Sequence, residues 1–262
     1  MTAQQDTFIS HLVELRDRLL RTLIVLGVVF IGLFLYPGSG PIYDYLAAPL
    51  MQALPEGTKM IATGVITPFL VPVKVTAWMA LIVALPYVLY QAWAFVAPGL
   101  YAHEKRLVLP LVIASSVLFI AGIAFCYFFV FGKVFAFINS FAPQSITPAP
   151  DIEAYFGFVL TMFLAFGVTF EIPVVVVVLA RAGIVTIEQM KAARPYVIVG
   201  AFVIAAIVTP PDVLSQLLLA IPMCALYEVG LMFARFVAKK PGESDWKAPS
   251  DAEMERELDR KG

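Results

Sequence analysis

The chain of 262 residues has little charge, cysteine or histidine, and each shortage excludes a class of protein. Charged residues make up 14% of it, against roughly 25% in an average soluble domain, whereas 61% of the residues are hydrophobic. Its two cysteines, Cys126 and Cys224, lie in apolar runs and predict neither a disulfide framework nor a zinc site. With two histidines and no glycine-rich phosphate loop, the sequence matches neither a metalloprotease nor a nucleotide-driven pump. We expect an integral membrane protein that has no cofactor and binds no nucleic acid.

Apolar segments separated by charge predict an all-α, polytopic membrane protein, because backbone groups in hydrocarbon must be hydrogen-bonded within a helix. The expected spans are 22–36, 76–97, 107–131, 155–180, 196–208 and 214–234. The first could also be a cleaved signal peptide, but no small-residue cleavage site follows it, so we keep it as a span. At about 1.5 Å per residue the fifth is only about 20 Å long, short of a hydrocarbon core of about 30 Å. We therefore expect that the bilayer thins locally around the connection between the fifth and sixth spans, or that polar groups and water reach deeper there.

The distribution of lysine and arginine predicts the orientation in the membrane. If the residues before 22 are cytoplasmic, only Lys59, Lys74 and Lys133 of the 18 basic residues lie on the outer side. By the positive-inside rule, both termini are then cytoplasmic. The outer connections, 37–75 and 132–154, are long enough for a structured cap. We expect a cytoplasmic amphipathic segment, a transmembrane domain and a disordered cytoplasmic tail, at 1–21, 22–235 and 236–262.

Acidic residues at the inner surface have two interpretations. On the N-terminal helix, Glu14 and Asp17 are each four residues before an arginine, Arg18 and Arg21, which predicts ordinary ion pairs along the helix. Glu104 lies in the first inner loop beside Lys105 and Arg106, where a local ion pair and a binding role are equally compatible with the pattern. Neither acid is explained by membrane orientation, since acids contribute little to it.

Glu171 is an acid inside the fourth expected span. An unpaired carboxyl there costs a few kcal/mol, so a functional role is our first interpretation. The alternative is a protonated carboxyl bonded to a neighbouring helix, through Gln91 or through a carbonyl that Pro173 leaves free. Between the last two spans, Asp212 follows two prolines and is placed to cap the helix after it.

Longer motifs follow one another in order along the chain. They are His11-Leu-Val-Glu-Leu-Arg-Asp-Arg-Leu19, Met60-Ile-Ala-Thr63, Tyr90-Gln-Ala-Trp-Ala-Phe-Val-Ala-Pro98, Leu100-Tyr-Ala-His-Glu-Lys-Arg106, Phe166-Gly-Val-Thr-Phe-Glu-Ile-Pro173, Arg194-Pro-Tyr196 and Thr209-Pro-Pro-Asp-Val213. Over residues 8–235 the sequence thereby resembles the TatC family, the multispanning receptor subunit of the twin-arginine protein translocase. The resemblance implies a curved, glove-like bundle of six helices in the bacterial inner membrane. Its cargo would be folded proteins whose signal peptides carry paired arginines.

The resemblance also implies roles for particular residues. The signal peptide would be read by Glu14 and Glu104, with Arg16 and Phe95 in the same site. Arginine suits a carboxylate because its planar fork forms two hydrogen bonds at once. Single-span TatA-like and TatB-like partners would contact Glu171, Gln216 and Ala206. Pro49 and Asp212 match family positions in the outer loops and could equally be structural.

Our hypothesis is a non-enzymatic receptor whose transport is driven by the proton-motive force. The alternative is a proton-coupled solute transporter that uses Glu171 as its carrier; a third hypothesis is an assembly scaffold that never contacts cargo. The lack of a recognisable internal repeat counts against a transporter.

Overall fold

Helices make up nearly all of the chain that the computed structural model describes, namely residues 2–53, 59–100, 108–141, 149–209 and 212–237. The elements are α1 (Thr2–Leu35), α2 (Ser39–Ala53), α3 (Thr67–Leu100), α4 (Val108–Phe125), a π-helical turn η2 (Cys126–Val130), α5 (Phe131–Phe141), α6 (Ile152–Phe170), α7 (Ile172–Arg181), α8 (Ile187–Ala192), α9 (Arg194–Val208) and α10 (Val213–Val237). Within the described ranges, strand pairing is limited to one isolated bridge between Ile61 and Asp151. The predicted all-α class is confirmed.

Five stretches of helix are long and apolar enough to cross a membrane, and a sixth is shorter. The five are Leu12–Leu35, Thr67–Phe95, Leu109–Ile138, Ile152–Arg181 and Val213–Phe236. The sixth is α9, whose 15 residues agree with the expectation that the fifth span is short. The described residues of the six predicted segments lie almost entirely in these helical stretches, and the segment 155–180 is divided between α6 and α7. The N-terminal helix and the first span are one continuous helix, α1, as the sequence predicted.

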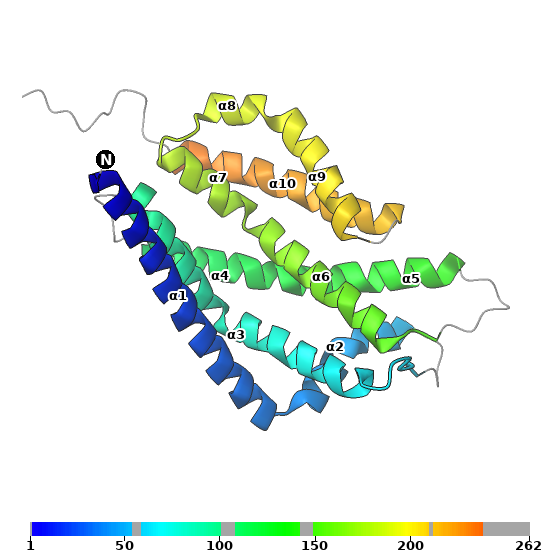
Figure 1. Cartoon of the computed structure of the whole chain (residues 1–262). Coiled ribbons are helices and arrows are strands. Elements are labelled where there is room, and N and C mark those ends of the chain that lie inside the picture. Colours follow the sequence, from blue (N-terminus) through cyan, green and yellow to red (C-terminus); the bar gives the residue numbers. More distant parts are fainter. Residues whose placement is uncertain (1, 54–58, 101–107, 142–148, 210–211, 238–262) are drawn as a thin grey trace, which may run out of the picture.

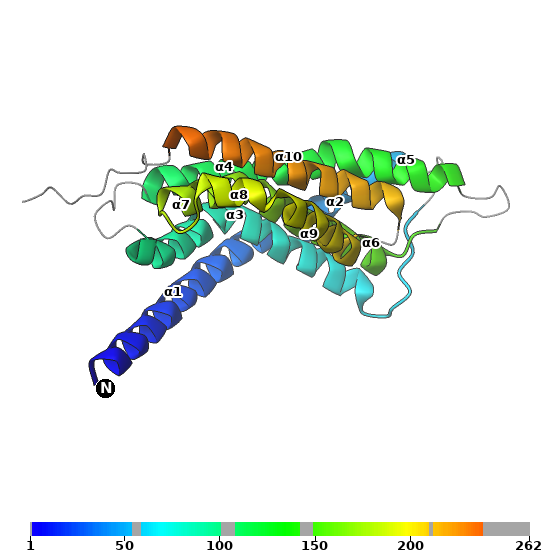
Figure 2. The same cartoon turned by 90° about the horizontal axis from the view of Figure 1, so that it is seen from above.

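The helix ends gather at two opposite sides of the molecule. Figure 1 shows the start of α1 and the α7–α8 turn at one side, and α2, the end of α5 and the start of α6 at the other. Seen from above in Figure 2, α1 projects at an angle from the body that the other helices form. This arrangement, with α1 at an angle to the other helices, corresponds to the curved bundle that we expected.

Aromatic side chains fill the centre of the body, where α6 packs against α4 and η2. Phe131, Phe156, Phe163 and Phe166 are fully buried. A side chain at Gly122 of α4 would place its Cβ 2.5 Å from the backbone oxygen of Phe166, so only glycine lets the two helices approach this closely. The packing of α6 fixes where its C-terminal end, and the acid that follows it, lie in the bundle.

The described parts of the two connections expected on the outer side, 37–75 and 132–154, contact each other in a structured cap, which we call the outer cap. Ile61 N donates to Pro150 O at 3.0 Å, and Ile152 N donates to Ile61 O at 2.9 Å. The carboxylate of Asp151 accepts from Thr63 N at 3.1 Å and Thr63 Oγ1 at 2.8 Å, and it also caps α6. These hydrogen bonds hold the pKa of Asp151 below its usual value, with the Thr63 hydroxyl making the largest contribution.

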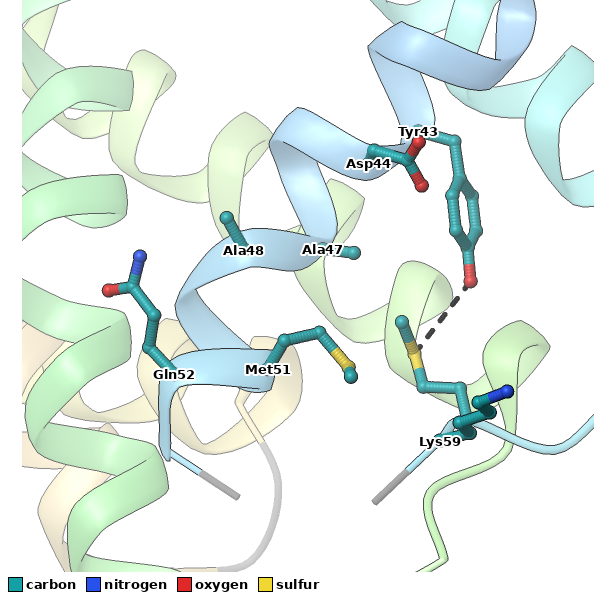
Figure 3. Close-up of a pocket in the computed structure, with 8 residues that line it drawn as sticks. Tyr43, Asp44, Ala47, Ala48, Met51, Gln52 and Lys59 are labelled. Carbon is teal, nitrogen blue, oxygen red and sulfur yellow. Dashed lines mark hydrogen bonds between the residues drawn. The ribbon is translucent and has the colours of Figure 1, made fainter. Parts of the chain in front are cut away.

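Beside the cap is a hollow of about 670 Å³. It is lined by Tyr43, Asp44, Ala47, Ala48, Met51, Gln52, Lys59 and Met60. Figure 3 shows Tyr43 on α2 reaching toward Met60, to whose sulfur its hydroxyl donates at 3.9 Å. None of the residues predicted to bind signal peptide or partner proteins lines this hollow.

Candidate functional site

Glu14 lies near the N-terminal end of the first span and already binds an arginine. Arg18, one turn further along α1, donates to Glu14 Oε1 from Nε at 2.9 Å and from Nη2 at 2.6 Å. The spacing of four residues brings the two side chains together on one face of the helix, so the predicted ion pair is confirmed. The Glu14 side chain is 39% exposed and that of Arg18 is 23% exposed. The Glu14 carboxylate is therefore partly exposed at the surface of the bundle, and its position lets it bind a guanidinium.

A glutamine on α3 joins this pair to the neighbouring helix. Arg18 Nη1 donates to Gln91 Oε1 at 3.1 Å, and Gln91 Nε2 donates to the Tyr87 hydroxyl at 2.7 Å. The amide of Gln91 is thus engaged at both ends, and the alternative interpretation in which it bonds to Glu171 is wrong. Sequence reasoning noticed Gln91 as a polar residue in an apolar span but chose the wrong partner, because the register between α1 and α3 depends on tertiary packing.

The other residues expected at this site are placed as follows. Phe95 is half-buried and lies one helical turn beyond Gln91, on the same face of α3. Arg16 Nη2 donates to Asp17 Oδ1 at 2.8 Å, so Asp17 pairs with its neighbour rather than with the predicted Arg21. Both Arg16 and Asp17 are exposed. Because they are adjacent in the sequence, their side chains can pair without the four-residue spacing that the predicted pair with Arg21 required. Glu104, the second expected ligand, lies outside the described residues.

Glu171 lies where α6 ends and α7 begins, inside a membrane-spanning stretch. Both of its carboxyl oxygens are buried, and neither has a hydrogen-bond partner among the described residues. Ser115 of α4 is close by; its hydroxyl accepts from Trp93 Nε1 at 3.0 Å and keeps its own hydrogen to donate. The bond to Gln91 that the alternative interpretation offered is not formed, and a functional role of Glu171 is taken up below as a proposal.

Three of the predicted residues lie at the end of α9, between α9 and α10, and in the first turn of α10. Asp212 Oδ1 accepts from Ser215 N at 2.7 Å, which confirms that Asp212 caps α10. Gln216 Nε2 donates to Phe202 O at 3.3 Å and ties α10 to α9. Ala206 is exposed on α9, where a partner or lipid can reach it. Pro49, the remaining predicted residue, lies inside α2 of the outer cap.

An ion pair that the sequence did not predict lies on α9 and α10. Arg194 Nη2 donates to Glu228 Oε2 at 2.6 Å, across 34 residues of sequence. Both side chains are partly exposed. Charge complementarity exists in the sequence, but only the antiparallel packing of α9 and α10 brings these two residues together.

Comparison with known proteins points to one family. Residues 10–222 match the family model described as Sec-independent protein translocase protein (TatC). A Haemophilus influenzae protein of that name is 49% identical over 250 residues, covering 95% of this chain and 97% of the relative. An Escherichia coli K12 protein of the same name is 49% identical over 238 residues, covering 90% of this chain and 92% of the relative.

A solved structure is similar as well. A crystal structure of the twin-arginine translocase receptor TatC superposes with a TM-score of 0.75 at 38% identity. The match covers 87% of this chain and 99% of the solved one. These similarities do not favour the alternative of a solute transporter.

Proposed function

The chain belongs to the TatC family of Sec-independent protein translocase proteins, and from this premise we propose how its residues receive cargo. It is a multi-pass membrane receptor and not an enzyme, and it works in a complex with other Tat subunits and cargo. We place it in the bacterial inner membrane with both termini cytoplasmic, which the excess of basic residues on that side supports.

Glu14 and Glu104 bind the paired arginines of the signal peptide in this proposal, with Arg16 and Phe95 beside them. The observation that carries it is the contact of Glu14 with the Arg18 guanidinium at 2.6 Å. The carboxylate is accessible from the surface and is already in a geometry that arginine fills. Lysine, a compact point charge, reproduces less of that contact.

Peptide binding to the purified full-length protein in nanodiscs tests this assignment. We expect Glu14→Gln and Glu104→Gln each to lower the affinity for a fluorescent twin-arginine peptide by at least about tenfold. A hydrogen bond to a charged group contributes about 1.5–3 kcal/mol, and the lower of these values corresponds to about tenfold in affinity. The matched control is Glu188→Gln, which removes one exposed carboxylate on α8. Charge reversal at both positions, Glu14→Arg with Glu104→Arg, should abolish peptide crosslinking in membranes. Normal binding by these variants contradicts the proposal and favours a scaffold that does not contact cargo.

TatA-like and TatB-like single-span proteins bind, in this proposal, at Glu171, Gln216 and Ala206. The unpartnered carboxyl of Glu171 and the exposure of Ala206 support it. In this proposal the partners assemble at these three residues before cargo passes, and the proton-motive force drives that passage. A photocrosslinker at Ala206 should capture a single-span partner, whereas one at the exposed Val28 of α1 should not. Equal labelling at the two positions contradicts a specific docking surface.

A further inference from the structure

We propose that Arg18 is an internal ligand of Glu14 that an incoming arginine must displace, so that the receptor at rest partly occupies its own site. The inference rests on the proposed function of Glu14. It concerns the regulation of that site and adds Arg18 and Gln91 to it as positioning residues.

The geometry makes Arg18 and a guest arginine competitors. Two nitrogens of Arg18 converge on a single oxygen of Glu14, Oε1, at 2.9 and 2.6 Å. A guanidinium that binds a carboxylate with two parallel hydrogen bonds uses both of its oxygens. A guest arginine that takes up this arrangement therefore needs Oε1, and the two Arg18 contacts occupy it.

Gln91 keeps the displaced Arg18 beside the site. Its Oε1 accepts from Arg18 Nη1 at 3.1 Å, and Gln91 itself is buried and held by Tyr87 at 2.7 Å. The Arg18 side chain is only 23% exposed, so its charge needs a hydrogen-bond acceptor. When a guest arginine replaces Arg18 at Glu14, the Gln91 oxygen remains as an acceptor and lowers the cost of keeping Arg18 partly buried. When the guest leaves, Arg18 returns from one helical turn away.

An internal competitor lowers the apparent affinity for every guest by the same factor, because it reduces the fraction of receptor that is competent to bind. For a half-buried pair with two hydrogen bonds we expect a factor on the order of three to ten. The preference for arginine over lysine is left unchanged. This equality separates displacement from a role of Arg18 in recognition, which would alter the ratio between the two guests.

The experiment measures binding of two fluorescent peptides, one with paired arginines and one with paired lysines, to the full-length protein in nanodiscs. Arg18→Gln should tighten both peptides by the same factor of about three to ten. Arg18→Lys keeps the charge but offers one ammonium for two partners, so it should tighten both by a smaller factor. If Arg18→Gln does not fold, the lysine variant provides the test.

The control for charge alone is Arg21→Gln, which removes the same positive charge from the next turn of α1. Its effect on cationic peptides should become small in 0.5 M salt, where the Debye length is about 4 Å, whereas the effect of Arg18→Gln should persist. Equal effects of the two variants at high salt overturn the proposal, as does weaker binding by a folded Arg18→Gln protein. If Glu14→Gln weakens binding but Arg18→Gln does not tighten it, this inference fails and the proposed function stands. If Glu14→Gln has no effect, the proposed function fails.

Discussion

At the residue scale, the Glu171 carboxyl works against the stability of the bundle, because both of its oxygens are buried and neither has a partner among the residues described. Replacing it with an apolar side chain of similar size removes that cost. We expect Glu171→Met to raise the free energy of unfolding by about 1–3 kcal/mol. Thermal unfolding in detergent measures this.

The same substitution should lower crosslinking to single-span Tat partners if the acid serves assembly. Stability and assembly would thus change in opposite directions. Glu171→Gln, which keeps a polar group, is the matched variant and should lie between wild type and Glu171→Met in stability. A loss of stability in Glu171→Met would contradict the prediction.

Asp212 also separates a structural role from a functional one. Its side chain caps α10 through Ser215 N at 2.7 Å. We expect Asp212→Ala to cost about 1 kcal/mol of stability, whereas Asp212→Asn, an equally good cap, should cost only a few tenths of a kcal/mol. Unfolding in detergent compares the two. If the asparagine variant is stable but exports no cargo, the charge of Asp212 has a function besides capping.

At the scale of elements, the outer cap should weaken in acid. The folded-state pKa of Asp151 is lowered by its hydrogen bonds, first of all by that from Thr63. The ionised carboxylate therefore stabilises the fold above the unfolded pKa of about 4, and this contribution is lost as the pH falls through the folded-state pKa.

The comparison that checks this uses Asp151→Asn. At pH 7 the wild-type protein should melt at a higher temperature than Asp151→Asn, and the difference should vanish near pH 2. Thr63→Val, which removes the hydroxyl that Asp151 accepts from, should reduce the same difference. A gap between wild type and Asp151→Asn that is independent of pH would show that the charge of Asp151 does not hold the cap.

At the scale of the whole molecule, the short α9 should bring the outer interface closer to the inner one. Ile207 is 13 residues beyond Arg194, a rise of about 20 Å, whereas the hydrocarbon core is about 30 Å thick. With Arg194 at the inner interface, a spin label at the exposed Ile207 contacts outer water only if the bilayer is thin there or water reaches deeper beside α9.

Accessibility of the label to a water-soluble relaxation agent measures this depth in liposomes. We expect high accessibility at Ile207 and at Leu217 of α10, and low accessibility at Val28, an exposed position in the longer α1. Labels at Ile207 and Leu217 that are as protected as the one at Val28 would mean a bilayer of full thickness.

Features that depend on neighbouring residues were predictable from the sequence. The Glu14–Arg18 pair follows from a spacing of four residues on a helix, and the cap by Asp212 follows from its place after two prolines. The six spans follow from hydrophobic runs between charges. The helix α2 was not predicted within the connection 37–75, because it is short and contains Pro49, and proline within a segment usually indicates a loop.

Features that depend on packing between helices were missed or assigned to the wrong partner. Gln91 was expected at Glu171 but bonds to Arg18, because α3 packs against α1 in that register. The contacts Arg194–Glu228 and Asp151–Thr63 join residues 34 and 88 positions apart. No local pattern specifies a partner at such a separation.

The sequence alone determined that this chain is a helical membrane protein, which way it is expected to lie in the membrane and which family it resembles. The helical spans and the expected orientation follow from the free energy of moving apolar and charged groups between water and lipid, which depends on residue type and order along the chain. The family resemblance follows from the motifs and their order. Only the tertiary structure decided that Glu14 shares Arg18 with Gln91 and that the Glu171 carboxyl has no partner among the described residues. These depend on distances of about 3 Å between helices, which arise from close packing of the whole bundle.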